Sequence, residues 1–381
     1  MWNTPEREAL RKAVFDFTTR EITPHLSKWE DEGFIPRELH RKTADAGILG
    51  IAFPESMGGQ GGDIIDSAIM TESMMAAGAS SGLLAGLFTH GIAIPHIAQS
   101  GNQDLIDRYV RPTLAGEKIG SLGITEPSGG SDVANIKTKA VRDGDHFVVN
   151  GAKTYITSGV RADFVTTAVR TGGEGHEGIS LLVIDKGTPG FEVAPPLKKM
   201  GWHCSDTAEL SFNDVRVPVS NLVGKENEGF AFIMGQFVNE RLSLAVQAYA
   251  TAERALKLAA DYSKQRETFG KPLAARQVIR HKLVDMHRKT AAARALTQQG
   301  YVNAIEKGVN DFSVVADALL AKRQAVEAAE WVVSEAVQIF GGMGYMRESE
   351  IERHYRDVRI MGIGGGANEV LNDLAARILG Y

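Results

Sequence analysis

The middle of the sequence differs in hydrophobic pattern from the residues on either side, and this change limits the folds that the chain can adopt. From about residue 118 to 222, short runs such as HFVVNGAKTYITSG, ADFVTTAVR and ISLLVID alternate apolar and polar residues. Asp143-Gly144 and Asn150-Gly151 are pairs typical of tight turns and should break these runs. The pattern predicts a β domain of short strands.

Both flanking regions repeat their apolar residues at helical spacing. Near the N-terminus, Thr4 is a suitable helix cap, Pro5 fits the first turn, and Leu10, Val14 and Phe17 recur at steps of three and four. Later stretches such as ERALKLAADYSKQ and FSVVADALLAKRQAVEAAEWVVSEAVQIF show the same period. A chain of 381 residues is too long for one ordinary core. We therefore expect three domains: helical over 1–117, β over 118–222 and helical over 223–381.

Composition excludes several classes of function. A formal net charge of -5 argues against a surface for nucleic acid or for acidic lipids. No apolar run approaches the length of a membrane span. The single cysteine, Cys204, excludes an internal disulfide framework and a cysteine-based metal site, and no metal is expected. The first residues, MWNTPEREALRKAV, lack a signal-peptide core and contain acids that a transit peptide avoids, so we expect a cytoplasmic protein.

One loop of the β block is suited to a polar ligand. The stretch GITEPSGGSDVAN, from Gly123 to Asn135, is rich in small residues, hydroxyl groups and backbone donors that could surround a cofactor or its pyrophosphate. It does not follow the glycine spacing of a dinucleotide-binding turn or of a Walker loop. Taken alone, the stretch is more typical of an ordinary loop than of a cofactor site.

Four longer motifs, in this order, resemble those of the acyl-CoA dehydrogenase family: ITEPSGGSD, YITSG, RETFG and QIFGGMGYMRESEIERHYRD. The resemblance extends over nearly the whole chain. It implies an N-terminal helical domain, a middle β-barrel and a C-terminal four-helix bundle. Two positions depart from the usual motif, since Asn135 replaces a small residue and Tyr155 replaces the tryptophan of many members. An aromatic ring at Tyr155 can still pack beside a flavin.

The resemblance implies FAD as the cofactor. Thr125 and Thr157 match positions that contact the isoalloxazine ring, Tyr155 packs beside it, and Gly130 and Ser131 match the pyrophosphate contact. The positions assigned to the remainder of the cofactor, partly across a subunit boundary, are Arg266, Phe269, Gln277, Gln338, Gly341, Gly342 and Glu369. Considered singly, Arg266 and Gln338 fit ordinary polar groups at helix ends better than cofactor ligands.

The usual catalytic base of the family is missing from its expected place. Most members carry Tyr-Glu-Gly-Thr after the Arg-Asp pair, and eight residues beyond Asp357 this chain has Gly365. Either the chain is a flavoprotein without turnover, or another carboxylate occupies the same space. Glu240 is the candidate, because it falls between Phe237 and Leu244 on an apolar helical face, where burial would raise its pKa toward the range of a general base. A core ion pair, for example with the adjacent Arg241, is the structural alternative.

A branch of the family resembling isovaleryl- and long-chain acyl-CoA dehydrogenases has both features, a Glu-Arg-Leu helix and glycine at the C-terminal position. VNERLSLA and IGGGANEV match both. This resemblance assigns the base to Glu240, and it implies α,β-dehydrogenation of an acyl-CoA thioester with hydride transfer to flavin N5. The residues that it assigns to substrate binding are Ser131, Arg241, Gly365 and Gly366.

Substrate size and partners follow from the same resemblance. Gly364 replaces a bulky aromatic residue of many relatives, which predicts a pocket for branched or medium-to-long acyl chains in fatty-acid or amino-acid breakdown. Electron-transferring flavoprotein is the expected electron acceptor, and a homotetramer built as a dimer of dimers is the expected assembly. Two alternatives stay open: an acyl-CoA-binding flavoprotein without turnover, and an oxygen-using acyl-CoA oxidase or flavin monooxygenase.

Overall fold

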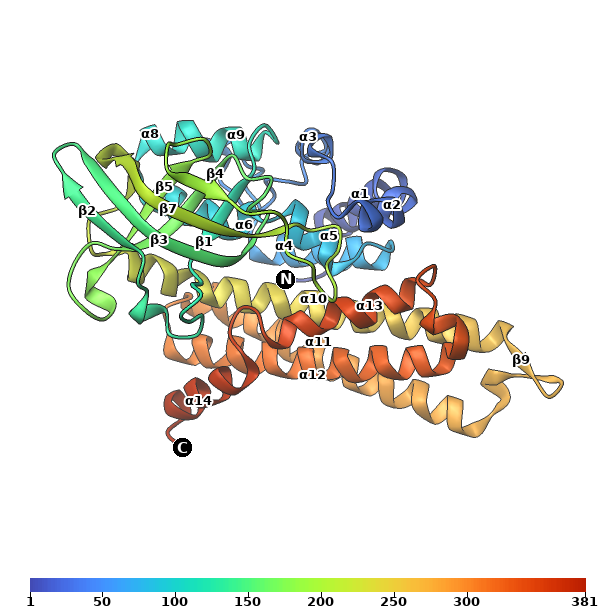
Figure 1. The fold of residues 1–381 in the computed structure, drawn as a ribbon. Helices are drawn as coiled ribbons and strands as arrows, with labels where there is room; N and C mark the ends of the chain where they lie inside the picture. The colour runs from blue at the N-terminus through green and yellow to red at the C-terminus, as the bar shows by residue number, and fades with distance from the viewer.

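The structure is a computed structural model that describes all residues from 1 to 381, and its ribbon separates into an N-terminal helical part, a β part and a C-terminal helical part (Figure 1). The helix predicted at the N-terminus is confirmed, since Thr4 caps it by accepting a hydrogen bond from the Arg7 backbone N–H at 3.3 Å. The helices of the first part are α1 Pro5–Glu21, α2 Leu26–Glu32, α3 Arg37–Asp45, α4 Ile64–Ala76, α5 Ser81–Leu87, α6 His90–Ala93, α7 Pro95–Gln99, α8 Gln103–Leu105 and α9 Arg111–Leu114.

The β part forms one sheet around a core of its own. Its strands follow the order β6-β7-β3-β2-β4-β5-β8, and β1 pairs in parallel with β4. Phe147, Val165, Leu182 and Phe212 belong to the buried apolar cluster that the sheet encloses. The strands are β1 Gly120–Gly123, β2 Lys139–Asp143, β3 His146–Thr157, β4 Phe164–Arg170, β5 Ile179–Asp185, β6 Phe191–Val193, β7 Thr207–Pro218 and β8 Leu222–Val223.

Only one of the two predicted turn pairs in this part is a turn. Asp143-Gly144 connects β2 to β3, as expected. Asn150-Gly151 lies inside β3, where the register with β7 shifts between Val149 and Gly151. A side chain at Gly151 would collide with Thr138, because an ideally placed Cβ would lie 2.6 Å from the Thr138 hydroxyl oxygen. The glycine therefore permits a β-bulge and close strand contact, and the prediction of a turn at this position was wrong.

The C-terminal part consists of three long helices and two shorter ones. At one end of the bundle, the rings of Tyr262 and Phe340 stack with their centroids 4.2 Å apart, which joins the end of α10 to the end of α12. A small hairpin, β9 Glu267–Thr268 and β10 Lys271–Pro272, projects from this end (Figure 1). The helices are α10 Gly229–Gln265, α11 Gln277–Lys307, α12 Phe312–Phe340, α13 Glu350–Val358 and α14 Asn368–Leu379.

The two helical parts share one core although the β part separates them in sequence. Val14, Met74, Tyr249 and Val326 all belong to a single cluster of 49 buried apolar residues. The Tyr249 hydroxyl also donates a 2.6 Å hydrogen bond to Glu72 of α4. No single helix combines the length and the apolar character needed to cross a bilayer. The expected order of helical, β and helical domains is confirmed.

Candidate active site

Glu240 lies near the start of α10 without an ion-pair or hydrogen-bond partner. The helix follows directly on the β part, and Ile233 and Phe237 pack into the apolar cluster that contains β-strand residues. An ideal Cβ built at Gly365 would lie 3.5 Å from Glu240 Oε1, so the two sequence positions meet in space. Burial raises the pKa of the Glu240 carboxyl above its ordinary value, while the charges of Arg241 and Lys322 act in the opposite direction.

The glycine-rich segment is a loop in which larger residues at Gly365 and Gly366 would be strained and would clash with their neighbours. Gly365 and Gly366 have φ angles of 64° and 101°, in the left-handed region that disfavours other residues. An ideal Cβ at Gly365 would lie 2.4 Å from Leu244 Cδ1, and one at Gly366 would lie 2.8 Å from Leu371 Cδ2. The loop can therefore lie directly on α10, next to Glu240.

Lys322 of α12 holds this loop in place. Its Nζ donates hydrogen bonds to the carbonyl oxygens of Gly364 at 2.5 Å and of Gly366 at 2.6 Å. The side chain is fully buried, and burial lowers the pKa of Lys322 to about 8, although the Glu240 charge acts to raise it. Sequence reasoning missed this residue. The available signal was a lysine on the same helical face as Leu319 and Val326, three residues after one and four before the other.

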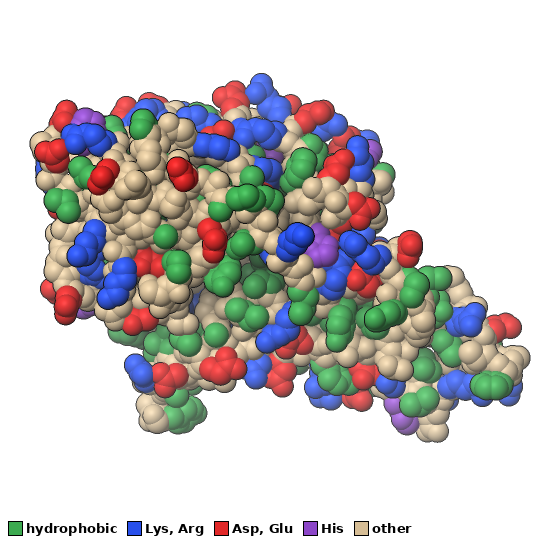
Figure 2. Space-filling view, viewed as in Figure 1, with side chains coloured by type: hydrophobic (Ala, Val, Ile, Leu, Met, Phe, Trp, Pro, Cys, Tyr) green, Lys and Arg blue, Asp and Glu red, His purple; other side chains and the backbone are tan.

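Arg241 is buried beside Glu240 but does not neutralise it. Its guanidinium carbon lies 4.9 Å from the centroid of the Phe237 ring, and its Nε has no hydrogen-bond partner. Other buried polar atoms without partners lie on the same stretch of α10 and at the start of α14, directly after the glycines: Gln236 Nε2, Asn239 Oδ1, Gln247 Oε1 and Asn368 Oδ1. Buried polar groups normally find partners, so this group of atoms fits a site for a polar ligand. Figure 2 shows hydrophobic side chains gathered along the seam between the β part and the long helices.

The proposed flavin-ring residues converge on one edge of the β part. The Thr125 carbonyl accepts a 2.9 Å hydrogen bond from the Thr154 backbone N–H, which places the loop after β1 beside the end of β3. Ser121 Oγ donates to the Thr157 carbonyl at 2.6 Å, so Thr157 lies beside β1, the strand that leads into this loop. Tyr155 is 70% exposed and has a φ of 60°, a conformation that β-branched and bulky residues rarely adopt.

The pyrophosphate candidates lie in the same loop. Gly130 is close enough to Thr125 that an ideal Cβ would lie 3.3 Å from Thr125 Cγ2, and Ser131 follows it with its side chain exposed. An exposed aromatic ring in a strained conformation beside hydroxyls and a small-residue loop fits a planar cofactor with a phosphorylated tail.

The remaining cofactor candidates lie elsewhere. Arg266 is the residue after α10, Gln277 begins α11 and Gln338 is in the last turn of α12, all at the end of the bundle that carries the hairpin. Phe269 at the hairpin tip is 97% exposed, and Gly341 and Gly342 at this end are exposed as well. Figure 1 shows this end directed away from the sheet. A single chain therefore does not bring these residues to Thr125 and Thr157. Glu369 is exposed in the first turn of α14.

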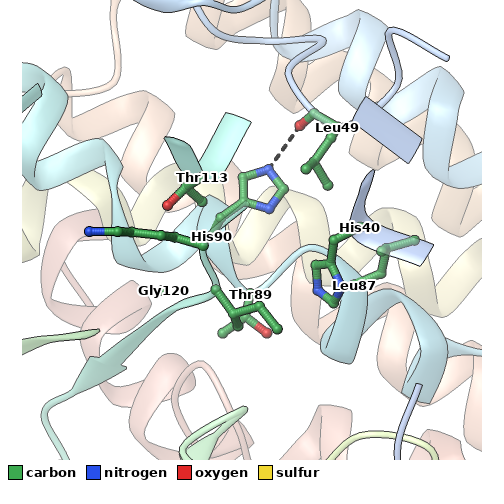
Figure 3. A pocket seen from close by; sticks show the side chains of 9 residues that line it. His40, Leu49, Leu87, Thr89, His90, Thr113 and Gly120 are labelled. Atoms are coloured by element: carbon green, nitrogen blue, oxygen red, sulfur yellow. Dashed lines mark hydrogen bonds between the residues drawn. The ribbon is translucent and has the colours of Figure 1, made fainter. Parts of the chain in front are cut away.

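A separate pocket lies in the N-terminal part, and its residues support the fold instead of the proposed site (Figure 3). It is lined by His40, Leu87, His90 and their neighbours, and none of the proposed site residues contributes to it. His90 Nε2 donates a 2.9 Å hydrogen bond to the Leu49 carbonyl, and burial lowers the pKa of His90 to about 4. The ring is therefore neutral near pH 7 and ties α6 to the segment after α3.

Comparison with known proteins assigns the whole chain. Family models for the N-terminal, middle and C-terminal domains of acyl-CoA dehydrogenase match residues 4–117, 121–215 and 227–380. A Mycobacterium abscessus crystal structure described as a "probable acyl CoA dehydrogenase" is 62% identical, covers 100% of both chains and superposes with a TM-score of 0.97. Mouse mitochondrial long-chain specific acyl-CoA dehydrogenase is 36% identical over 98% of this chain and 86% of its own length. Bovine mitochondrial isobutyryl-CoA dehydrogenase is 34% identical over 98% and 89%. These matches, together with the order of the three domains, show that the chain belongs to the acyl-CoA dehydrogenase family of flavoprotein oxidoreductases.

Proposed function

We propose that this chain converts a branched or medium-to-long acyl-CoA into its trans-2-enoyl-CoA, with Glu240 as the base that removes the α-proton. The observation that carries the proposal is the unpaired Glu240 carboxylate beside Gly365. A flavoprotein without turnover would more naturally show this carboxylate exposed or neutralised by an arginine, and neither is the case. An acceptor in a desolvated position is what proton abstraction from carbon requires.

The chain's own residues would divide the work between binding and proton transfer. Thr125, Gly130, Ser131, Tyr155 and Thr157 would hold the flavin end of FAD against the β part. When bound, FAD supplies the acceptor for the hydride that leaves the substrate's β-carbon. Its other end requires the group around Arg266, which a neighbouring subunit would provide.

Proton transfer would take place on the other side of the substrate. Glu240 would take the α-proton, and the Gly365 backbone N–H would polarise the thioester carbonyl so that this proton becomes acidic. Arg241 and Gly366 would contact the substrate near the same loop. The unpaired polar atoms of α10 would then find partners in the bound acyl-CoA.

The predicted preference for larger or branched acyl groups is supported by the space at Gly364. An ideal Cβ at this position would meet only Ile360 atoms, the nearest at 3.5 Å, so the volume beyond it is open. We further propose that electron-transferring flavoprotein reoxidises the flavin. An oxygen-using oxidase or monooxygenase would instead consume oxygen during turnover without an acceptor protein, which an oxygen electrode detects. A cytoplasmic location stays an expectation.

The test is anaerobic flavin reduction by the Glu240→Gln variant with a panel of straight and branched acyl-CoAs. The amide keeps the shape but cannot accept the proton, so the rate should fall about 10²- to 10⁴-fold while flavin content and acyl-CoA binding persist. Glu253→Gln is the matched control, because Glu253 lies on the same helix and pairs with Arg294 at 3.0 Å. A wild-type reduction rate in Glu240→Gln would refute the assignment of the base.

A further inference from the structure

Lys322 is the one buried cation that links the glycine loop to the proposed base. An ideal Cβ at Gly365 would lie 3.5 Å from Glu240 Oε1 and 3.6 Å from Lys322 Nζ, so both charged groups border the same small volume. The Lys322 side chain on α12 is fully buried, and so are Leu319, Ala325 and Val326, which lie within four residues of it in the sequence. A lysine in such a position costs stability unless its charge has partners.

The partners of the ammonium group come from two elements. The glycine loop contributes two carbonyl oxygens, those of Gly364 and Gly366, and no titratable side chain. Helix α10 contributes two charges, Glu240, which attracts the ammonium group, and Arg241, which repels it. No side-chain oxygen forms an ion pair with Lys322. The buried charge is therefore compensated by the loop backbone and by the field of Glu240, instead of by a structural salt bridge.

We propose that Lys322 is a positioning residue for the reaction: it fixes the Gly364–Gly366 backbone that presents the Gly365 N–H, and its charge favours the ionised form of Glu240. The inference rests on the proposed function of Glu240 and extends it. A left-handed pair of glycines has little conformational preference of its own, so two hydrogen bonds from one buried donor are an effective restraint. A cation near a buried carboxyl also keeps the carboxyl ionised at lower pH than burial alone would allow.

The test replaces Lys322 by methionine, which has a similar shape and no charge. Arg323→Met is the matched control, since Arg323 is the next residue and pairs at 3.0 Å with Glu327 on its own helix. We measure the anaerobic flavin-reduction rate per bound flavin as a function of pH, together with amide hydrogen exchange in residues 360–368. In Lys322→Met the rate should fall about tenfold or more because the loop is less restrained. The pH midpoint should move upward by about 1 unit, because removing the cation raises the Glu240 pKa.

A purely structural lysine predicts a different result. Lys322→Met would then lower the thermal midpoint and the yield of folded protein, while the rate per bound flavin, the pH midpoint and loop exchange stayed at wild-type values. That outcome would overturn the proposal. If Lys322→Met does not fold, Lys322→Gln takes its place, because it keeps N–H donors but loses the charge. The same upward shift is then required, and an unchanged midpoint refutes the role of the charge.

The two proposals can fail separately. If Glu240→Gln reduces flavin at the wild-type rate, the base has been assigned wrongly, whatever Lys322 does. If Glu240→Gln is inactive and Lys322→Met retains the wild-type rate and pH midpoint, the base stands and only the role of Lys322 is refuted.

Discussion

Gly365 and Glu240 border the same small volume, and a third residue, Leu244, limits which side chains can fit at position 365. The resemblance to the family implies that most members place their base where this chain has Gly365, so exchanging the two residues should restore a carboxylate from the loop side. The structure shows two obstacles: Gly365 has a φ of 64°, and an ideal Cβ would lie 2.4 Å from Leu244 Cδ1. The second obstacle is the end of a flexible side chain, which a smaller residue removes.

We therefore predict a graded result for the exchange. Glu240→Gly with Gly365→Glu should recover measurable flavin reduction relative to Glu240→Gly alone, with a preference shifted toward unbranched substrates. Adding Leu244→Ala should raise the rate about tenfold further by relieving the contact. Leu244→Ala in the otherwise unchanged chain is the control and should stay within a few-fold of wild type. No gain from Leu244→Ala in the exchanged chain would show that backbone strain at Gly365, and not the clash, limits the exchange.

At the residue scale, the sequence indicates which charged residues interrupt an apolar helical face, but not which groups those residues contact. Glu240 could be proposed as the base because it interrupts an apolar face of α10 and because Gly365 stands where the resemblance to the family places the usual carboxylate. Lys322 interrupts an apolar face of α12 in the same way. Its proposed role depends on hydrogen bonds to carbonyl groups more than 40 residues further along the chain, and a sequence does not show which backbone carbonyls a side chain will contact. Pairings of this kind become visible only when the helix and the loop are seen together.

Among the elements, the loop after β1 depends on a buried ion pair for its shape. Glu126 accepts hydrogen bonds from the backbone N–H groups of Lys137 and Thr138, at 2.5 and 2.8 Å, and from Lys153 Nζ at 2.8 Å. Lys153 also donates to the Ile124 carbonyl at 3.0 Å. Both side chains are almost completely buried. The pair therefore fastens the loop carrying the proposed flavin contacts to strand β3.

Removing one partner should loosen this loop and weaken cofactor retention. Glu126→Gln leaves the Lys153 charge without its carboxylate, and breaking a buried pair in this way costs about 3–5 kcal/mol of unfolding free energy. Denaturant unfolding and the ratio of bound FAD to protein measure the two effects. The double change Glu126→Gln with Lys153→Met should be less destabilised than Glu126→Gln alone, because the unpaired charge is gone. Asp261→Asn, which breaks the exposed Lys257–Asp261 pair, is the control and should alter neither quantity appreciably.

Element types were more predictable than element boundaries. The Thr4 cap and the spacing of Val14 and Phe17 are local signals, and the predicted helix is present as α1. Asn150-Gly151 is also a local signal, yet the strand continues through it. Glycine is required there because Thr138 packs closely against the backbone, and this contact cannot be inferred from the dipeptide. Tertiary contact thus overrode turn propensity at the one place where both require glycine.

For the whole molecule, the separation of the two groups of proposed cofactor residues is the main consequence of the fold. Thr125, Tyr155 and Thr157 lie on the β part, and Glu240 lies near the start of α10, the helix that follows this part. Arg266, directly after α10, and Phe269, at the tip of the hairpin, are both exposed at the opposite end of the bundle. A cofactor that uses both groups must then lie between two copies of the chain, which favours the expected assembly of dimers within a tetramer. A purified monomer with stoichiometric FAD would contradict this arrangement.

Subunit complementation tests the shared site directly. Glu240→Gln should keep FAD but lose flavin reduction, whereas Arg266→Glu should lose FAD because it places a negative charge where a phosphate is expected. Each variant alone is inactive for its own reason. If every site combines the β part and base of one chain with the hairpin end of another, co-expression of both variants produces some sites in which both halves are intact. Random pairing predicts about a quarter of the wild-type activity in the mixture, from sites with an intact Glu240 on one chain and an intact Arg266 on its partner. If each site is instead built within one chain, every site carries one of the two defects. The co-expressed mixture then shows no activity beyond that of the separate variants.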